Sequence, residues 1–144
     1  MPEIQAEAVT EGLTPEELWS LVKDGEGIAS RAGHVVDVRT VPSESRQYRT
    51  TAWTVLLNGS EVSWVQREFA EEGPRLRFEQ VSGDLEELTG EWSVDSAPGG
   101  SRLALSIAFE LGIDGLAPLL EPIWAQSFQA HVDALLRAVT ADTT

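Results

Sequence analysis

The order of hydrophobic and polar residues divides this chain into a strand, two short helices, a run of strands and a long final helix. Apolar and polar residues alternate over residues 4–10, which predicts a first strand. Thr14, Pro15 and Glu17 then form a helix start: a capping threonine, a proline at the first position and a glutamate that completes a capping box. Three glycines between residues 23 and 33 interrupt this helix and leave room for a short second one.

From residue 34 onward the hydrophobic period becomes two, and turn residues separate six strands in meander order. The expected strands are residues 34–41, 46–57, 60–70, 75–81, 85–94 and 102–111. After a break at residues 112–115, helical spacing returns, and we expect a long helix from about Pro122 with one apolar face. The pattern predicts a single α+β domain over residues 1–144, with a seven-stranded antiparallel sheet covered by the C-terminal helix.

The dipeptide Asn58-Gly59 determines which side chains share a face of the sheet. Both central positions of a two-residue hairpin turn need positive φ, so this dipeptide is a strong hairpin signal. The resulting register places the following pairs on one face: Leu57 with Ser60, Val55 with Val62, Trp53 with Trp64, Thr51 with Gln66, and Arg49 with Glu68. An apolar wall with a polar cluster at one end is the usual composition of a small-molecule pocket. The alternative is that the tryptophans fill a core and that Arg49 and Glu68 form an exposed ion pair.

The two histidines are the remaining candidates for chemistry. His131 lies on the apolar side of the final helix, three residues after Phe128, where it is either a hydrogen-bonded core residue or a group that faces a pocket. His34 opens a strand, and we interpret it as structural. Two histidines without any cysteine do not predict a metal site. No cofactor is predicted either, because the chain has no dinucleotide fingerprint or P-loop.

Composition excludes several classes of partner. The 144 residues include 10 Lys+Arg and 24 Asp+Glu, which gives a formal net charge of −14 at pH 7. So few basic residues do not build the positive patch that nucleic acid or an anionic membrane surface requires. No signal peptide or membrane-spanning run is recognisable, and we expect a cytoplasmic protein. The five tryptophans carry more of the functional inference than the charge does.

Three segments together resemble the polyketide cyclase/aromatase branch of the START-like (Bet v 1-like, SRPBCC) superfamily. They are residues 53–68 (WTVLLNGSEVSWVQRE), 76–80 (LRFEQ) and 90–92 (GEW). The first and last helices fit the same pattern, so the resemblance covers nearly the whole chain. It implies a helix-grip fold, in which a curved antiparallel sheet wraps around the long C-terminal helix and encloses a cavity.

The resemblance also implies a function. It points to an aromatase/cyclase that binds a poly-β-ketone and promotes regioselective aldol cyclisation and dehydration in polyketide and antibiotic biosynthesis. The implied partners are a small hydrophobic, aromatic polyketide-like ligand and an acyl carrier protein. The alternative is a carrier or sequestering protein that binds a flat hydrophobic metabolite, such as a polyketide, quinone or lipid, without chemistry.

The chain departs from the family pattern in the strand that contains Trp64. Relatives commonly read Trp-x-Ser-x-Arg there, whereas this chain has Gln66 and Glu68, and Arg67 is one residue out of phase. His131 occupies a position that relatives often fill with asparagine. The candidate catalytic residues are His131 as base or proton shuttle, Glu68 as a second base, and Gln66 and Arg49 as oxyanion donors. The candidate ligand contacts are Trp53, Trp64, Trp92, Trp124, Val55, Val62 and Phe128.

Overall fold

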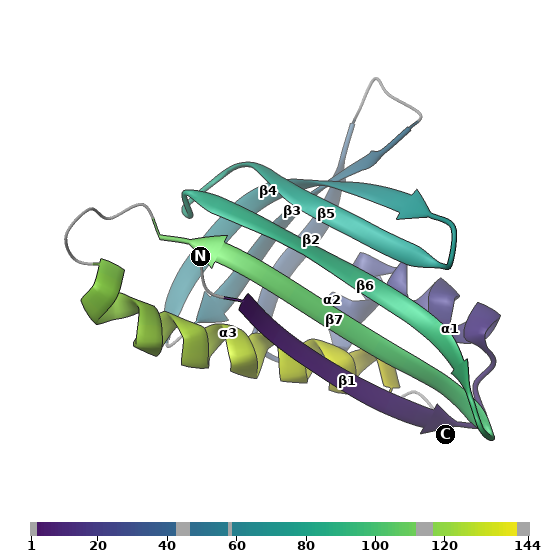
Figure 1. Ribbon diagram of the computed structural model, residues 1–144. Coiled ribbons are helices and arrows are strands. Elements are labelled where there is room, and N and C mark those ends of the chain that lie inside the picture. The colour runs from purple at the N-terminus through teal and green to yellow at the C-terminus, as the bar shows by residue number, and fades with distance from the viewer. Residues whose placement is uncertain (1–2, 43–46, 58, 112–116, 141–144) are drawn as a thin grey trace.

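A curled antiparallel sheet packs against one long helix, with two short helices at one end (Figure 1). The computed structural model describes residues 3–42, 47–57, 59–111 and 117–140, without the side chains of residues 117–121. The elements are β1 (Glu3–Glu11), α1 (Pro15–Val22), α2 (Gly25–Arg31), β2 (Val35–Val41), β3 (Arg49–Leu57), β4 (Ser60–Glu71), β5 (Arg75–Gly83), β6 (Glu87–Ala97), β7 (Gly100–Glu110) and α3 (Ala117–Thr140). This order confirms the predicted sequence of elements.

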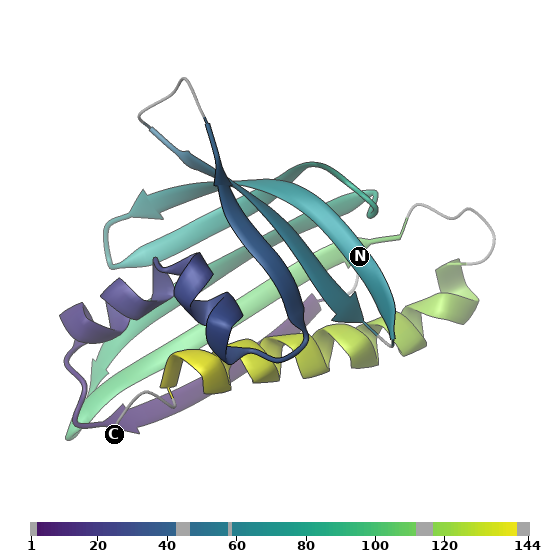
Figure 2. The ribbon, with the colours of Figure 1, turned by 180° about the vertical axis from the view of Figure 1, so that it is seen from behind.

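The seven strands are arranged in the order β1-β7-β6-β5-β4-β3-β2, and every neighbouring pair is antiparallel. Helix α3 lies along β1 and also contacts β3 and β7. Helix α1 packs on β6 and β7 while α2 packs on β2, so the two short helices bridge the two sides of the curled sheet (Figure 2). Among the described residues, no helix combines the length and the apolar composition needed to cross a membrane.

The helix starts follow from local hydrogen bonds. At α1 the side chain of Thr14 accepts from the backbone N–H of Glu17 at 3.1 Å, and the carboxylate of Glu17 accepts from the backbone N–H of Thr14 at 3.0 Å. This confirms the predicted capping box. At α2 the side chain of Asp24 accepts from the backbone N–H of Gly27 at 3.0 Å.

The hairpin register is confirmed in full. Strands β3 and β4 pair Trp53 with Trp64 and Arg49 with Glu68, as the two-residue loop requires. Gly59 has a φ of +79°, the left-handed conformation that the turn needs, while Asn58 lies outside the described residues. Arg67 faces the outer side of the sheet, where its guanidinium lies 4.9 Å from the centre of the Tyr48 ring.

Most boundaries differ from the prediction by one to three residues, and the start of α3 differs most. Helix α3 begins at Ala117, five residues before Pro122, so that this proline lies inside the helix rather than at its start. A proline there removes one backbone hydrogen bond of the helix, because it has no backbone N–H to donate. Strand β3 begins at Arg49 rather than at residue 46, and residue 46 and the predicted break at 112–115 lie outside the described residues.

A glycine on β6 leaves room for a core aromatic ring. A Cβ atom at Gly90 would lie 2.2 Å from Cζ of Phe78 and 2.6 Å from the backbone oxygen of Ser106. Phe78 is buried on the inner face of β5, directly opposite Gly90 in the ladder. The ring therefore occupies the space that any other residue at position 90 would need.

Substituting Gly90 tests this packing against a matched glycine. We expect Gly90→Ala to lower the free energy of unfolding by about 1–3 kcal/mol, the usual cost of overpacking. Gly33→Ala is the control, because a Cβ there meets no atom within 4 Å and its φ is outside the left-handed region. Urea denaturation followed by tryptophan fluorescence measures both variants, and equal stabilities would contradict the packing argument.

Candidate functional site

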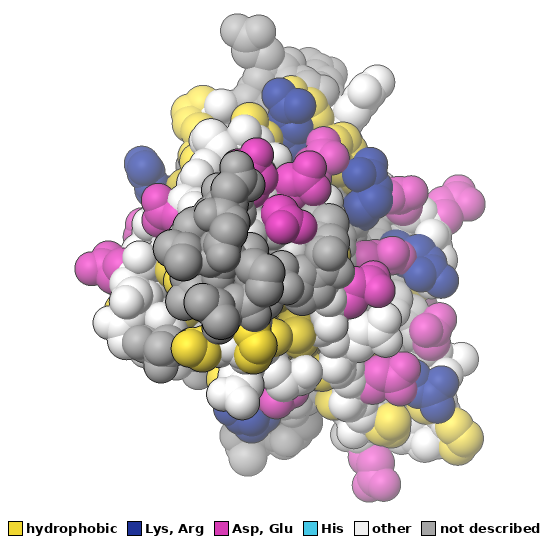
Figure 3. All heavy atoms as spheres, turned by 60° about the vertical axis from the view of Figure 1, so that its left-hand side comes forward, with side chains coloured by type: hydrophobic (Ala, Val, Ile, Leu, Met, Phe, Trp, Pro, Cys, Tyr) yellow, Lys and Arg dark blue, Asp and Glu magenta, His cyan; other side chains and the backbone are white. Residues whose placement is uncertain are grey.

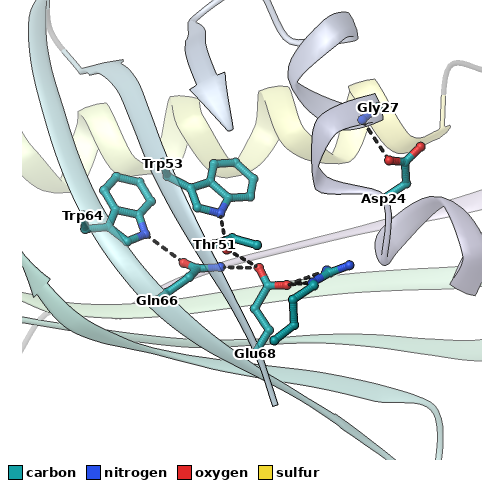
Figure 4. A network of polar contacts seen from close by, with 8 residues as sticks. Asp24, Gly27, Thr51, Trp53, Trp64, Gln66 and Glu68 are labelled. Carbon is teal, nitrogen blue, oxygen red and sulfur yellow. Dashed lines mark hydrogen bonds and ion pairs between the residues drawn. The ribbon is translucent and has the colours of Figure 1, made fainter. Parts of the chain in front are cut away.

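A carboxylate buried on the inner face of the sheet connects the polar side chains of β3 and β4. The side chain of Glu68 is 4% exposed, and its Oε1 accepts from Nε of Arg49 at 2.8 Å and from Nη2 of the same residue. Its Oε2 accepts from the hydroxyl of Thr51 at 2.9 Å and from Nε2 of Gln66 at 2.7 Å. Both carboxylate oxygens are therefore saturated by donors from two neighbouring strands (Figure 4).

The same network holds two indole rings. Nε1 of Trp53 donates to the hydroxyl of Thr51 at 3.0 Å, and Nε1 of Trp64 donates to Oε1 of Gln66 at 2.7 Å. The two rings are parallel within 1°, with centroids 6.2 Å apart. Figure 4 shows the two indoles side by side, each joined to Glu68 through one intermediate residue. Both tryptophans are buried, so this network fixes the orientation of aromatic rings within the core.

The ion pair of Arg49 and Glu68 is not the exposed pair of the alternative interpretation. The Arg49 side chain is 38% exposed, whereas the Glu68 side chain is almost completely buried. The arginine therefore reaches from the surface to a buried carboxylate. A hollow of about 350 Å³ opens at this end of the network, between Lys23, Tyr48 and these two residues.

His131 lies at the other end of the row of aromatic side chains. It is 3% exposed, and the rings of Trp64 and Phe128 approach it edge-on, each with a centroid distance of 6.2 Å. Nδ1 of His131 lies 2.5 Å from Nε2 of His34, which precedes β2. The two imidazoles therefore share one N–H···N hydrogen bond between α3 and the edge of the sheet.

Burial keeps both imidazoles of this pair uncharged. Burial, with a smaller contribution from the neighbouring His34, lowers the pKa of His131 to about 3. Burial also lowers the pKa of His34, with Arg137 of α3 as a second cause because two positive charges repel. At neutral pH, each ring is therefore a neutral group with one N–H donor and one nitrogen acceptor.

A groove of about 380 Å³ opens onto the imidazole pair. One wall is a single face of α3, and the other is formed by His34 and Leu56 at the edge of the sheet. Leu56 and Ile123 on the rim are 40% and 47% exposed, which is high for large apolar side chains. The volume falls within the range of roughly 300–1,000 Å³ that is typical of small-molecule sites. We call this hollow the imidazole groove.

The remaining predicted contacts belong to the core. Val55 and Val62 are buried as a cross-strand pair, and Trp92 is buried on β6 between Leu76 and Leu105 of the neighbouring strands. On α3, Phe128 is buried against Phe109, with ring centroids 4.5 Å apart. Trp124 is partly buried, and its ring centroid lies 6.4 Å from that of Phe128. Their role as ligand contacts stays a prediction.

Two residues of this site, Thr51 and His34, were not predicted to have a functional role from the sequence. Thr51 was placed on the correct face, and its position between Arg49 and Trp53 on that face was an available signal. The contact of His34 with His131 spans 97 residues and depends on how α3 packs against the sheet edge, so no local pattern could have shown it. Within the described residues, no group of three or more His, Cys, Asp or Glu is placed to hold a metal ion.

The same substitution at two arginine-paired glutamates tests the network. We expect Glu68→Gln to lower the free energy of unfolding by about 1–3 kcal/mol. The glutamine NH₂ group would face a buried donor that the carboxylate oxygen now accepts from, so that donor would lose its partner. Glu91→Gln removes the exposed partner of Arg75 and should leave stability nearly unchanged. Near-UV circular dichroism should change only in Glu68→Gln, since Trp53 and Trp64 lose their anchor. An unchanged spectrum and stability in both variants would contradict this role of Glu68.

The buried His131 predicts a pH dependence of stability. Its pKa of about 3 in the folded protein lies below the usual value of 6.5, so between these values the unfolded chain binds more protons. The free energy of unfolding should therefore fall by about 2 kcal/mol between pH 7 and pH 5. His131→Phe keeps an apolar ring but removes the titrating group, so urea denaturation should show a much smaller fall. If the free energy of unfolding fell equally with pH in the wild type and in His131→Phe, the low pKa of His131 would be disproved.

Comparisons with known proteins agree with this architecture. Residues 12–140 match the sequence profile of the family described as "Polyketide cyclase / dehydrase and lipid transport". No curated protein sequence matches the chain significantly. Among solved structures, the protein TTHA0849 from Thermus thermophilus is similar, with 28% sequence identity and a TM-score of 0.89 over 97% of this chain and 95% of that chain.

More distant structures share the fold. The Zhui aromatase/cyclase from Streptomyces sp. R1128 has 15% identity and a TM-score of 0.77 over 96% of this chain and 93% of that chain. A START superfamily protein from Mycobacterium smegmatis has 14% identity and a TM-score of 0.65 over 92% of this chain and 98% of that chain. These similarities confirm the predicted helix-grip fold. Because the family profile spans most of its length, the chain belongs to the polyketide cyclase/dehydrase and lipid transport family.

Proposed function

We propose that this protein is an aromatase/cyclase that binds a poly-β-ketone chain and promotes its aldol cyclisation and dehydration. The observation that carries the proposal is the neutral imidazole pair of His34 and His131, onto which a groove of small-molecule size opens. Family membership and the fold shared with an aromatase/cyclase support it. The proposed donor of the chain is an acyl carrier protein, and the proposed site of action is the cytoplasm.

The chemistry needs a proton acceptor near a carbon that lies between two carbonyl groups. Removing that proton gives an enolate, which attacks a distant ketone before water is lost. A neutral imidazole can accept the proton and return it, whereas an imidazolium cannot accept one. The apolar rim at Leu56 and Ile123 suits a flat hydrophobic chain, and holding an already reactive chain in one fold would supply a further part of the rate.

The other predicted catalytic groups form hydrogen bonds with one another or with neighbouring side chains. Both oxygens of Glu68 accept hydrogen bonds, and the amide of Gln66 bridges Trp64 and Glu68. Arg49 directs Nε and Nη2 to Glu68 at the end of the network opposite the imidazole groove, so it does not serve as the oxyanion donor for a ligand bound in that groove. In this proposal Glu68 orients the aromatic rings, and the imidazole pair accepts the proton and returns it.

A carrier function without chemistry is the second candidate, and one observation favours it. Burial lowers the pKa of His131 to about 3, which makes this imidazole a weak base at neutral pH. Binding of a flat hydrophobic metabolite needs no base at all. A carrier would therefore work with the same groove and the same buried aromatic residues.

Product analysis with a reactive poly-β-ketone separates the two functions. We expect His131→Ala to reduce cyclised product by about 10²–10⁴-fold, the usual contribution of acid–base catalysis. Glu68→Gln should have a smaller effect through the indole rings, and Glu91→Gln, on the exposed side of the sheet, should match the wild type.

Two results would overturn the catalytic proposal. One is unchanged turnover and regiochemistry in both His131→Ala and Glu68→Gln. The other is native mass spectrometry in which the wild type retains the added poly-β-ketone in stoichiometric amount and chemically unaltered. Either result would favour the carrier.

A further inference from the structure

We propose that His34 is the residue that exchanges protons with the ligand, and that His131 acts through it as a positioning residue. This inference rests on the proposed function and assigns the proton step within it. It reverses the assignment expected from the sequence, in which His131 is the base and His34 is structural. The exposure of the two rings, the atoms that join them and the groove beside them support this assignment.

The two rings differ in access to the imidazole groove. His131 is 3% exposed and is enclosed by the rings of Trp64 and Phe128. His34 is only half-buried and forms the sheet-edge wall of the groove together with Leu56. A ligand that enters the groove therefore meets the imidazole of His34 with less displacement of the core than it would need to reach His131.

The atoms of the shared hydrogen bond leave one nitrogen of His34 available. Nε2 of His34 faces Nδ1 of His131 at 2.5 Å, so this nitrogen is occupied. Within the part of the chain that the structure describes, Nδ1 of His34 makes no hydrogen bond. A histidine that accepts a proton from a ligand needs one nitrogen without a hydrogen bond. Its other nitrogen must be held in place by a partner.

The hydrogen bond to His131 determines what that free nitrogen can do. When Nε2 of His34 donates to His131, the single proton of the neutral ring is on Nε2 and Nδ1 carries a lone pair. In this tautomer His34 is a base toward the groove. In this arrangement buried His131 has the role that an orienting acceptor has for a catalytic histidine elsewhere: it accepts from Nε2 and holds the ring in place.

The proton transfer needs no cofactor, because every bond and proton is accounted for by the ligand and His34. The C–H bond of a carbon between two carbonyls breaks, its electron pair forms the enolate, and its proton moves to Nδ1 of His34. His34 becomes an imidazolium that still donates from Nε2 to His131. When the enolate carbon bonds to a distant ketone carbon, the new alkoxide takes the proton back from Nδ1. Burial and, to a smaller extent, the repulsion from Arg137 destabilise the imidazolium, which favours the return of the proton.

A simple aryl β-keto ester tests the proton step apart from cyclisation. Ethyl benzoylacetate has an acidic C–H between two carbonyls and a flat ring, and NMR in D₂O follows the replacement of that hydrogen by deuterium. We expect the wild type to exchange it above the buffer rate and His34→Ala to lose about 10²-fold or more of this excess rate. Added imidazole should restore exchange in His34→Ala, because it can occupy the vacated space at the groove wall.

Two substitutions at position 131 separate positioning from catalysis. His131→Gln keeps an acceptor for Nε2 of His34 and should retain most of the exchange, whereas His131→Phe should lose it. Imidazole should not rescue His131→Phe, because His34 still occupies its own place in the groove. Thr54→Ala is the control, since it removes a side-chain hydrogen bond of 3.0 Å on the outer face of β3. Thermal unfolding establishes that each variant is folded.

A measurement on the wild type keeps the inference testable if a variant does not fold. ¹⁵N NMR should show a scalar coupling across the N–H···N bond, and ethyl benzoylacetate should shift the signal of Nδ1 of His34 more than either signal of His131. Wild-type exchange at the buffer rate, or full exchange in His34→Ala, would overturn the inference. If exchange depends on His34 but no poly-β-ketone is cyclised, the proposed function fails while the assignment of the proton-exchanging residue holds.

Discussion

Burying the carboxylate of Glu68 imposes a requirement on the surrounding strands, because each of its oxygens must receive donors that replace water. The cross-strand pairing of β3 and β4 meets this requirement by placing Arg49, Thr51 and Gln66 around it. Two of these donors in turn accept from Trp53 and Trp64. The orientation of the aromatic rings is therefore a consequence of satisfying one buried charge, and loss of that charge would release both rings.

A second polar contact joins the helix to the sheet. The hydrogen bond of His34 and His131 connects α3 to the start of β2, an edge strand that pairs with β3 alone. The contact is made between two neutral rings, so it avoids the desolvation cost of a buried ion pair. The ring of Trp64 lies between the Glu68 network and the histidine pair, with its centroid 6.2 Å from that of His131. The inner face therefore carries one continuous row of contacting side chains from Arg49 to the imidazole groove.

The parts of this arrangement differ in how far the sequence predicts them. Register follows from Asn58-Gly59 and the period of two, and it correctly placed Trp53, Trp64, Gln66 and Glu68 on one face, because alternation is a local property. Burial of Glu68 is not local: a carboxylate beside an arginine is usually exposed, and this one is buried by packing between segments that are distant in the sequence. The pairing of His34 with His131 depends on the packing of α3, whose start at Ala117 was itself expected later because proline usually marks a first turn.

Charge is distributed very unevenly between the surface and the interior. Figure 3 shows acidic side chains spread over one face of the molecule, whereas Glu68 is the one buried carboxylate among the described residues, and it is paired with Arg49. The described side chains that line the imidazole groove are all uncharged. An anionic ligand would have to lose its hydration there without an ion-pair partner among the described lining residues, which costs far more than burying a neutral carbonyl chain. The overall charge of −14 is therefore carried at the surface, while the uncharged side chains described in the groove suit the neutral ligand of the proposed function.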